Sequence, residues 1–259
     1  MKAILTLLFG FFTCWVSGQV KEAKDDNRTI KIPVIFHVIS SENSPHIDSW
    51  VSTELIRKEI KDLNDNYSAS NDMSNLHTEF KVKVGNPNIE FYLADFKGSD
   101  NVNGIIRVKT VRKYGTDNQI DTNKYLNIYI SDDNNSTSMS PYHNVRINYK
   151  DLGAGGQTVT HELGHYFGLW HVWGASNCRK IKLFSNRNDF IEDTPEQKNC
   201  TDLSRAKPCP DILNNTNINF NNFMDYSACR CMFTEKQAIE IRNNIIKYRP
   251  EIFSNSLGS

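Results

Sequence analysis

The chain has 259 residues, and its 30 lysine and arginine side chains balance 30 aspartate and glutamate side chains, so the formal net charge is zero. This balance excludes the basic surface that a nucleic-acid-binding protein needs. Hydrophobic residues make up 39% and aromatic residues 11% of the chain, which is enough for a packed core and too much for a disordered protein. At about 100–200 residues per domain, the length predicts one large domain or two small ones.

The N-terminus has the pattern of a secretory signal peptide. Lys2 precedes an apolar run over residues 3–12, and the stretch that follows ends on the small residues Ser17 and Gly18. This run is shorter than the roughly 20 residues that span a bilayer. We therefore expect a signal peptide at residues 1–18, a secreted mature chain without stable membrane insertion, and a short tail or remnant pro-segment at residues 19–29.

The first part of the mature chain contains strand and helix patterns. A β-rich apolar run covers residues 30–39, where Pro33 favours an edge strand. Apolar residues then recur at helical spacing after the expected N-cap, Ser52 or Thr53, and this helix ends near residues 64–66. Four further strands are predicted, at residues 89–94, 104–111, 125–130 and 145–149.

The second part begins with a glycine-rich turn at residues 153–156, which leads into a helix over residues 157–168. After residue 172, Asn, Asp, Cys and Pro dominate until Phe233, where a final amphipathic helix follows. This order of elements predicts an α+β fold in two lobes.

One segment of the central helix carries the chemistry, and it reads His161-Glu-Leu-Gly-His165-Tyr-Phe-Gly168-Leu-Trp-His171. His161 and His165 are four residues apart, so their imidazoles project from one helix face and can share a metal ion. Gly168 permits the positive φ that ends the helix and brings His171 back as a third ligand.

Three neutral imidazoles and an open position are typical of a catalytic zinc site. Glu162 lies beside the ligands and is expected to act as the general base on a water that zinc activates. A purely structural zinc site is the alternative, but such sites normally have four protein ligands.

With the pattern H-E-x-x-H-x-x-G-x-x-H, the chain resembles the metzincin metalloendopeptidases. Their second mark is a methionine turn, and Asn222-Phe223-Met224-Asp225-Tyr226 is similar to it. The resemblance implies that Met224 lies under the metal, and that Tyr226 helps zinc to stabilise the tetrahedral intermediate.

Within the metzincins, the chain looks most like the pappalysins, the cytophagalysin group that includes ulilysin. The residues after His171 are Val-Trp-Gly, which the astacins, matrixins, serralysins and adamalysins do not have there. Further matching stretches extend this resemblance over roughly residues 30–248: IPVIFHVI, LNDNYS, FYLAD, NGIIRV, YLNIYI, EDTP and CRCMFTEKQ.

The cysteines that follow the signal peptide all lie in the last third of the chain, and in an exported protein such clustering favours disulfides. The resemblance implies two bridges, Cys178–Cys209 and Cys200–Cys229, and leaves Cys231 free. The alternative exchanges the roles of Cys229 and Cys231.

The resemblance also implies structural calcium in the lower lobe. Hard oxygen ligands for it are available from Asp189, Glu192, Asp193 and Thr194.

The sequence departs from the pappalysin pattern between Tyr226 and Cys229. Family members often have a longer acidic stretch there, which helps to select a basic residue after the scissile bond. Here the stretch is missing and Arg230 lies nearby. We therefore expect a different preference, either apolar or acidic.

Together, these observations predict a two-lobed metzincin-type catalytic domain over residues 30–250. A mixed twisted sheet and helices, about residues 30–171, lie above the cleft. The lower lobe, about residues 172–250, is irregular and disulfide-bridged, with the methionine turn and the C-terminal helix, and a tail follows at residues 251–259.

The predicted function is a secreted, monomeric endopeptidase with one catalytic zinc ion, acting on protein or peptide substrates and not on nucleic acid. The alternative is a catalytically silent secreted binding protein that retains the fold. The intact Glu162 and the three histidines disfavour this alternative.

Overall fold

The computed structural model describes residues 24–95, 101–102, 104–110, 119–132, 135–138, 145–174, 189–197, 200–201 and 218–255. The signal peptide expected at residues 1–18 and the bridge expected between Cys178 and Cys209 lie outside these residues. Within them, no helix has both the length and the apolar character needed to cross a membrane.

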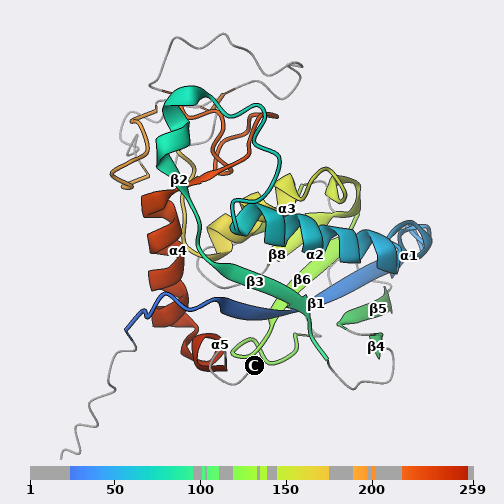
Figure 1. Ribbon diagram of the computed structural model, residues 1–259. Helices are drawn as coiled ribbons and strands as arrows, with labels where there is room; N and C mark the ends of the chain where they lie inside the picture. Colours follow the sequence, from blue (N-terminus) through green and yellow to red (C-terminus); the bar gives the residue numbers. More distant parts are fainter. Residues whose placement is uncertain are drawn as a thin grey trace, which may run out of the picture.

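A twisted, mostly parallel sheet forms the centre of the fold (Figure 1). Its central strand, β1 (Ile30–Ser41), pairs in parallel with β3, β5 and β6, and β6 pairs in parallel with β8. The two short edge strands β4 and β7 are antiparallel to β5 and β8. The bounds of these strands are β3 Ile89–Leu93, β4 Asn101–Val102, β5 Ile105–Thr110, β6 Leu126–Ser131, β7 Thr137–Ser138 and β8 Val145–Asn148.

Pro33 does not place β1 at an edge, so that prediction was wrong. On the side of β3, Ile30 and Val34 make the hydrogen bonds, to Asn88 and Ala94. Along a strand, the backbone groups of successive residues point to alternate neighbours, so the backbone nitrogen of Pro33 points toward β6. Pairing between β1 and β6 begins only at Val34. The missing N–H of proline falls just before the ladder starts, so no strand hydrogen bond is lost.

Two helices cover one face of the sheet, α2 (Thr53–Tyr67) and α3 (Gln157–Tyr166) (Figure 1). The Ser52 side chain caps α2 by accepting a hydrogen bond from the Leu55 N–H at 3.1 Å. Apolar residues of both helices join the strand residues in one buried core. The predicted strand and helix patterns are confirmed here to within a few residues. The remaining short elements of this half are α1 (Ile47–Trp50) and two 3₁₀ helices, Thr78–Lys83 and Tyr149–Asp151.

The C-terminal part returns to regular structure at β9 (Phe233–Thr234), which pairs antiparallel with β2 (Val84–Gly85). Thr234 and Gln237 form a reciprocal capping box that begins α4 (Glu235–Tyr248). A further helix, α5 (Pro250–Asn255), follows. The expected tail from residue 251 is therefore not a tail, because Ile252 and Phe253 are buried in the main core.

The segment before β1 is also held in place, although its charged sequence predicts no structure. Arg242 of α4 is buried, and its guanidinium donates two hydrogen bonds to the Asp25 carboxylate, at 2.7 and 2.5 Å. A third bond joins Arg242 to the Arg28 carbonyl at 3.0 Å. The Arg242 side chain holds the pKa of Asp25 below its usual value.

Candidate active site

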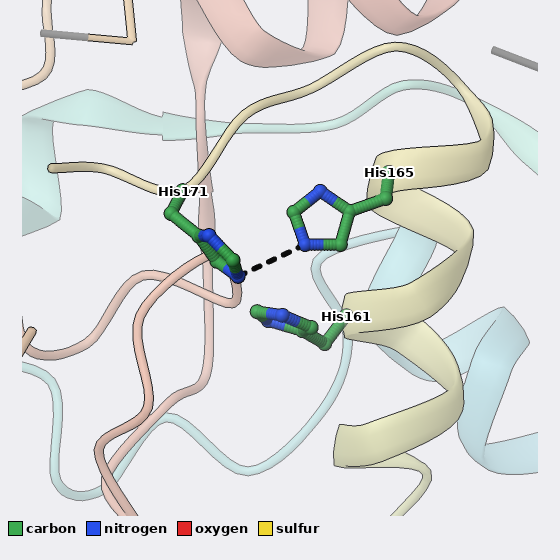
Figure 2. Close-up of side chains that lie close together, drawn as sticks. All are labelled: His161, His165 and His171. Atoms are coloured by element: carbon green, nitrogen blue, oxygen red, sulfur yellow. Dashed lines mark hydrogen bonds between the residues drawn. The ribbon is translucent and has the colours of Figure 1, made fainter. Parts of the chain in front are cut away.

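The three histidines of the sequence motif converge on one point (Figure 2). His161 and His165 lie one turn apart on α3, and the chain then turns at Gly168, which has φ +93°. This turn brings His171 back toward the helix, so that one ligand atom from each histidine lies within 4.8 Å of the other two. Among the described residues, this is the only group of three or more potential metal ligands from His, Cys, Asp and Glu.

The hydrogen bonds of the two helical histidines fix which nitrogen is free. His161 Nδ1 lies 2.7 Å from the Phe223 carbonyl and His165 Nδ1 lies 2.8 Å from the Leu169 carbonyl. Because a carbonyl only accepts, both Nδ1 atoms carry the proton, and both Nε2 lone pairs face the common point.

This arrangement fits a zinc ion. His165 Nε2 and His171 Nε2 are 3.0 Å apart, and two nitrogens on one tetrahedral zinc at about 2.0–2.1 Å would be about 3.3 Å apart. Burial lowers the pKa of all three imidazoles, that of His171 to about 2. The ligands are therefore neutral at pH 7, as metal binding requires.

Glu162 is buried beside the histidines, with 7% of its surface exposed. Burial raises the pKa of its carboxyl to about 7, although the Ser138 backbone N–H and the charge of Arg230 oppose the shift. A carboxyl with a pKa near 7 is suited to take up and release a proton at neutral pH. Ser138 belongs to the edge strand β7, so Glu162 lies where the sheet edge meets α3.

Met224 is fully buried directly against α3. A Cβ atom at Gly164 would lie 2.3 Å from Met224 Sδ, so any larger residue at that helix position would displace the Met224 side chain. The Met224 carbonyl accepts a hydrogen bond from the Val172 N–H at 3.3 Å, which ties the turn to the segment of the third histidine. The sequence signal for this contact was a glycine inside an otherwise regular helix, which normally costs about 1 kcal/mol.

Tyr226 stands at the open side of the cluster, with 44% of its surface exposed. Its ring centroid lies 5.4 Å from that of His161 and 5.0 Å from that of His171. Trp173, whose importance the motif did not indicate, stacks on His171 at 4.4 Å and contacts Tyr226 at 4.9 Å. The tyrosine hydroxyl makes no hydrogen bond to any described residue, so it is available to a bound molecule.

Three residues of α2 hold the start of α3, and sequence reasoning missed them. Glu59 Oε2 accepts a hydrogen bond from the Gly153 N–H at 2.9 Å. Asn66 Nδ2 donates to Thr160 Oγ1 at 2.9 Å, and the Tyr67 hydroxyl donates to the Thr160 carbonyl at 3.2 Å. No signal in the sequence separates these from ordinary helix residues, because their partners are about 90 positions away.

The residues expected to bind calcium do not form a carboxylate cluster in the described part of the chain. Asp193 instead caps α4, since its carboxylate accepts hydrogen bonds from Thr234 Oγ1 at 2.6 Å and from the Lys236 N–H at 2.9 Å. Asp189 accepts a bond from Thr194 Oγ1 at 2.6 Å, and Glu192 faces solvent.

The cysteines of this region differ in state. Cys200 and Cys229 are both disulfide-bonded, whereas Cys231 is a free and buried thiol. Burial raises the pKa of the Cys231 thiol to about 12. That Cys200 and Cys229 are partners of each other stays a prediction.

Comparison with known proteins now identifies the family. Residues 109–246 match the model of peptidase family M43, described as pregnancy-associated plasma protein-A. The chain belongs to this family. The predicted resemblance to pappalysins is therefore confirmed.

Curated relatives of this M43 chain include fungal extracellular metalloproteases. A protein of Aspergillus fumigatus is 38% identical over 92 residues, which is 34% of this chain and 27% of that protein. A protein of Neurospora crassa is 28% identical over 246 residues, covering 85% of this chain and 76% of that protein. The chain thus spans about a quarter of the first of these relatives and three quarters of the second.

Solved structures from Tannerella forsythia share the fold. A promirolysin variant superposes with a TM-score of 0.70 at 27% identity, covering 89% of this chain and 86% of that chain. Mature mirolysin in complex with a cleaved peptide gives a TM-score of 0.65 at 27% identity, covering 87% and 98%. The predicted mixed sheet with helices of metzincin type is confirmed by these matches.

Proposed function

We propose that this M43 family member is a secreted zinc-dependent endopeptidase that hydrolyses peptide bonds in proteins. One observation carries the proposal: three imidazoles converge beside a buried carboxyl group whose pKa is near 7. We assign the catalytic domain to residues 30–250 together with the rest of α5, whose Ile252 and Phe253 pack in the same core. The extracellular names of the fungal relatives support secretion.

His161, His165 and His171 would hold the zinc ion, and the open side at Tyr226 leaves room for a water molecule and the substrate. When bound, zinc supplies a Lewis acid that lowers the pKa of water to about 7 and polarises the scissile carbonyl. Glu162 accepts a proton from the attacking water and donates it to the nitrogen of the leaving amine.

Tyr226 is assigned the stabilisation of the negative charge that develops on the carbonyl oxygen. Its hydroxyl is unengaged among the described residues, and its ring packs against two of the proposed ligands. Met224 forms the apolar support under the histidines. The substrate lies extended along the edge strand β7, whose outer side is unpaired within the described sheet and can accept a peptide by main-chain hydrogen bonds.

The test compares the mature chain with its Glu162→Gln variant, which keeps the shape of the side chain and removes the base. Casein cleavage should be lost in the variant by at least about 100-fold, since general bases contribute about 10²–10⁴-fold. Zinc content, measured by atomic absorption, should be equal in both proteins. Chelation should abolish wild-type cleavage, and zinc should restore it.

Folded, zinc-loaded wild-type protein that cleaves neither casein nor a peptide library would contradict the proposal. That result would favour a catalytically silent binding protein.

A further inference from the structure

Arg230 joins the first turn of α3 to the residue before Tyr226. Gln157 Nε2 donates a hydrogen bond to the Arg230 carbonyl at 2.9 Å, and Arg230 Nη1 donates one to the Asp225 carbonyl at 3.2 Å. Gln157 precedes His161 by four residues, so it lies one helical turn away on the same face. The Arg230 side chain is thereby held next to the proposed catalytic centre.

The guanidinium of Arg230 is left largely unsatisfied. It has five N–H donors, but among the described residues its side chain makes one hydrogen bond, to Asp225, and its Nε atom is buried without a partner. Within the described residues it forms no ion pair at 4.0 Å or less. The Asp225 carboxylate cannot serve, because its oxygens accept bonds from Tyr226 N, Thr201 N, Thr201 Oγ1 and Gln197 Nε2.

A partly buried charge without an anionic partner is costly, so such groups in native proteins normally have one. Arg230 acts on the catalytic groups through its charge. After burial, it contributes to the lowered pKa values of His161 and His171, and it opposes the raised pKa values of Glu162 and Tyr226. The positive charges of Arg230 and of a bound divalent metal together exceed the single negative charge of Glu162. This side of the site therefore attracts anions.

The side of the cleft follows from the chemistry of Glu162. A base that receives the proton of water and passes it to the leaving amine must lie on the leaving-group side of the scissile bond. The Arg230 carbonyl is bonded to Gln157, in the helix that carries Glu162, and Arg230 Nη1 is bonded to the residue before Tyr226, so we place its guanidinium on this side of the site.

We propose that Arg230 is a specificity-determining residue that binds a carboxylate on the leaving-group side of the substrate. The carboxylate comes either from an Asp or Glu side chain directly after the scissile bond or from a nearby free C-terminus. Planar, bidentate pairing of guanidinium and carboxylate would satisfy the donors that Arg230 leaves unused. This inference rests on the proposed endopeptidase function.

A cavity of about 310 Å³ beside Arg230 is the observation that most favours the opposite preference, for a basic residue after the scissile bond. It is lined by Arg230 and Gln157 and also by Asp62, Asp65 and Asp72. Two of these carboxylates are already paired, Asp62 with Lys58 at 2.5 Å and Asp65 with Lys61. Asp72 accepts a hydrogen bond from the Ser74 N–H at 2.8 Å, and among the described residues none of the three aspartates forms an ion pair with Arg230. The Arg230 guanidinium is instead bonded through Nη1 to the Asp225 carbonyl, next to Tyr226.

The experiment uses zinc-loaded, full-length mature protein and peptides of one Gly- and Ala-rich frame. The peptides differ at one position, which holds Glu, Gln, Ala or Arg, and each is made with an amidated or a free C-terminus. Mass spectrometry identifies the bond that is cut, and kcat/KM is measured for each peptide.

We expect the wild type to cut before Glu about 10- to 100-fold faster than before Gln, the range of a charge-assisted hydrogen bond. Arg230→Gln should reduce this ratio to about one. If Arg230 binds the free C-terminus instead, the 10- to 100-fold difference in kcat/KM will lie between the peptides with a free and those with an amidated C-terminus. Arg57→Gln, the same substitution at an exposed position of α2, should change nothing.

Binding provides a second readout. Zinc-loaded Glu162→Gln should bind a fluorescently labelled Glu peptide more tightly than its Gln counterpart, and the added Arg230→Gln change should remove the difference. Two outcomes would overturn the proposal: fastest wild-type cleavage before Arg, or an equal loss of kcat for all peptides in Arg230→Gln. The second would place Arg230 in transition-state stabilisation. An absence of cleavage of every peptide and of casein would refute the endopeptidase function itself.

Discussion

The two halves of this molecule are stabilised in different ways. In the sheet and its two helices, a large apolar core dominates, and buried polar side chains such as Glu59, Asn66 and Thr160 are a minority. Around the methionine turn, by contrast, fully buried polar side chains connect an irregular backbone: Asn219, Asn221, Asn222, Asp225 and Ser227. The site is built across both halves, since α3 supplies two histidines and the irregular half supplies Met224 and Tyr226.

This difference indicates which half of the molecule makes the site more sensitive to substitution. An apolar core tolerates small changes of shape, whereas a buried polar network loses the full desolvation cost of each group that becomes unpaired. We therefore expect the geometry of the metal site to depend on the polar half more than on the sheet.

Zinc removal should produce the largest effect. A ligand that binds only the folded state stabilises it by about 4 kcal/mol at 1,000 times its dissociation constant. Because the ion would join the halves, chelation should lower Tm and increase amide hydrogen exchange mainly at residues 218–232, leaving β1 and β6 protected. An equal increase in both regions would show that the two halves do not differ in this way.

Asn222→Ala should destabilise the protein by about 3 kcal/mol, measured by urea unfolding. Asn222 Oδ1 accepts a hydrogen bond from the Met224 N–H at 2.9 Å, and its Nδ2 donates to Gln237 Oε1 at 2.7 Å, so both partners lose a bond in a buried site. Ile128→Val in the sheet should cost only about 1 kcal/mol.

The matched control is Asn243→Ala at an exposed position of α4, which should be nearly neutral. Asn222→Leu restores volume without restoring hydrogen bonds and should not recover stability. Recovery would mean that packing, and not polar satisfaction, holds the turn.

The smallest expected effect concerns Glu59, a fully buried carboxyl group of α2 that bonds to the turn before α3. Burial raises the pKa of its carboxyl from 4.5 to about 7. The folded state therefore holds its proton more tightly than the unfolded state, so stability is greatest below about pH 4.5 and falls as pH rises toward and through 7. Glu162 and Asp189 share this direction, so the difference between wild type and Glu59→Gln isolates Glu59.

Between pH 5.5 and 6.5, the wild type should lose about 1 kcal/mol relative to Glu59→Gln, because one pKa unit corresponds to about 1.36 kcal/mol. Parallel stability curves for the two proteins would show that Glu59 ionises normally in the folded state.

The sequence predicted those features that local patterns encode. Periodicity located α2, α3 and α4, and fixed spacing along one helix identified His161 and His165. Gly168 indicated the return of the chain to His171. These predictions worked because each depends on residues within about ten positions of one another.

Features that depend on distant partners could not be predicted in the same way. Pro33 marked an edge strand by local rules, but only the register with β6 shows that its missing donor costs nothing. Asp193 has the chemistry of a calcium ligand, yet its carboxylate accepts a hydrogen bond from the Lys236 N–H at the start of a helix 43 positions later. The same holds for Glu59, whose partner in the glycine-rich turn is 94 positions away.

Cys229 is disulfide-bonded and Cys231 is free, and this difference has a consequence for oxidative folding. The bonded and the free cysteine are two positions apart, so in the unfolded chain either thiol can attack the same disulfide at nearly equal rates. Only the thiolate attacks, and with a pKa of about 12 Cys231 is deprotonated in roughly one molecule in ten thousand at pH 8. Exchange between the two isomers should therefore be fast early in folding and should stop once Cys231 is buried. Mispaired protein is then best rescued before it packs, by a thiol–disulfide buffer present during refolding and not added afterwards.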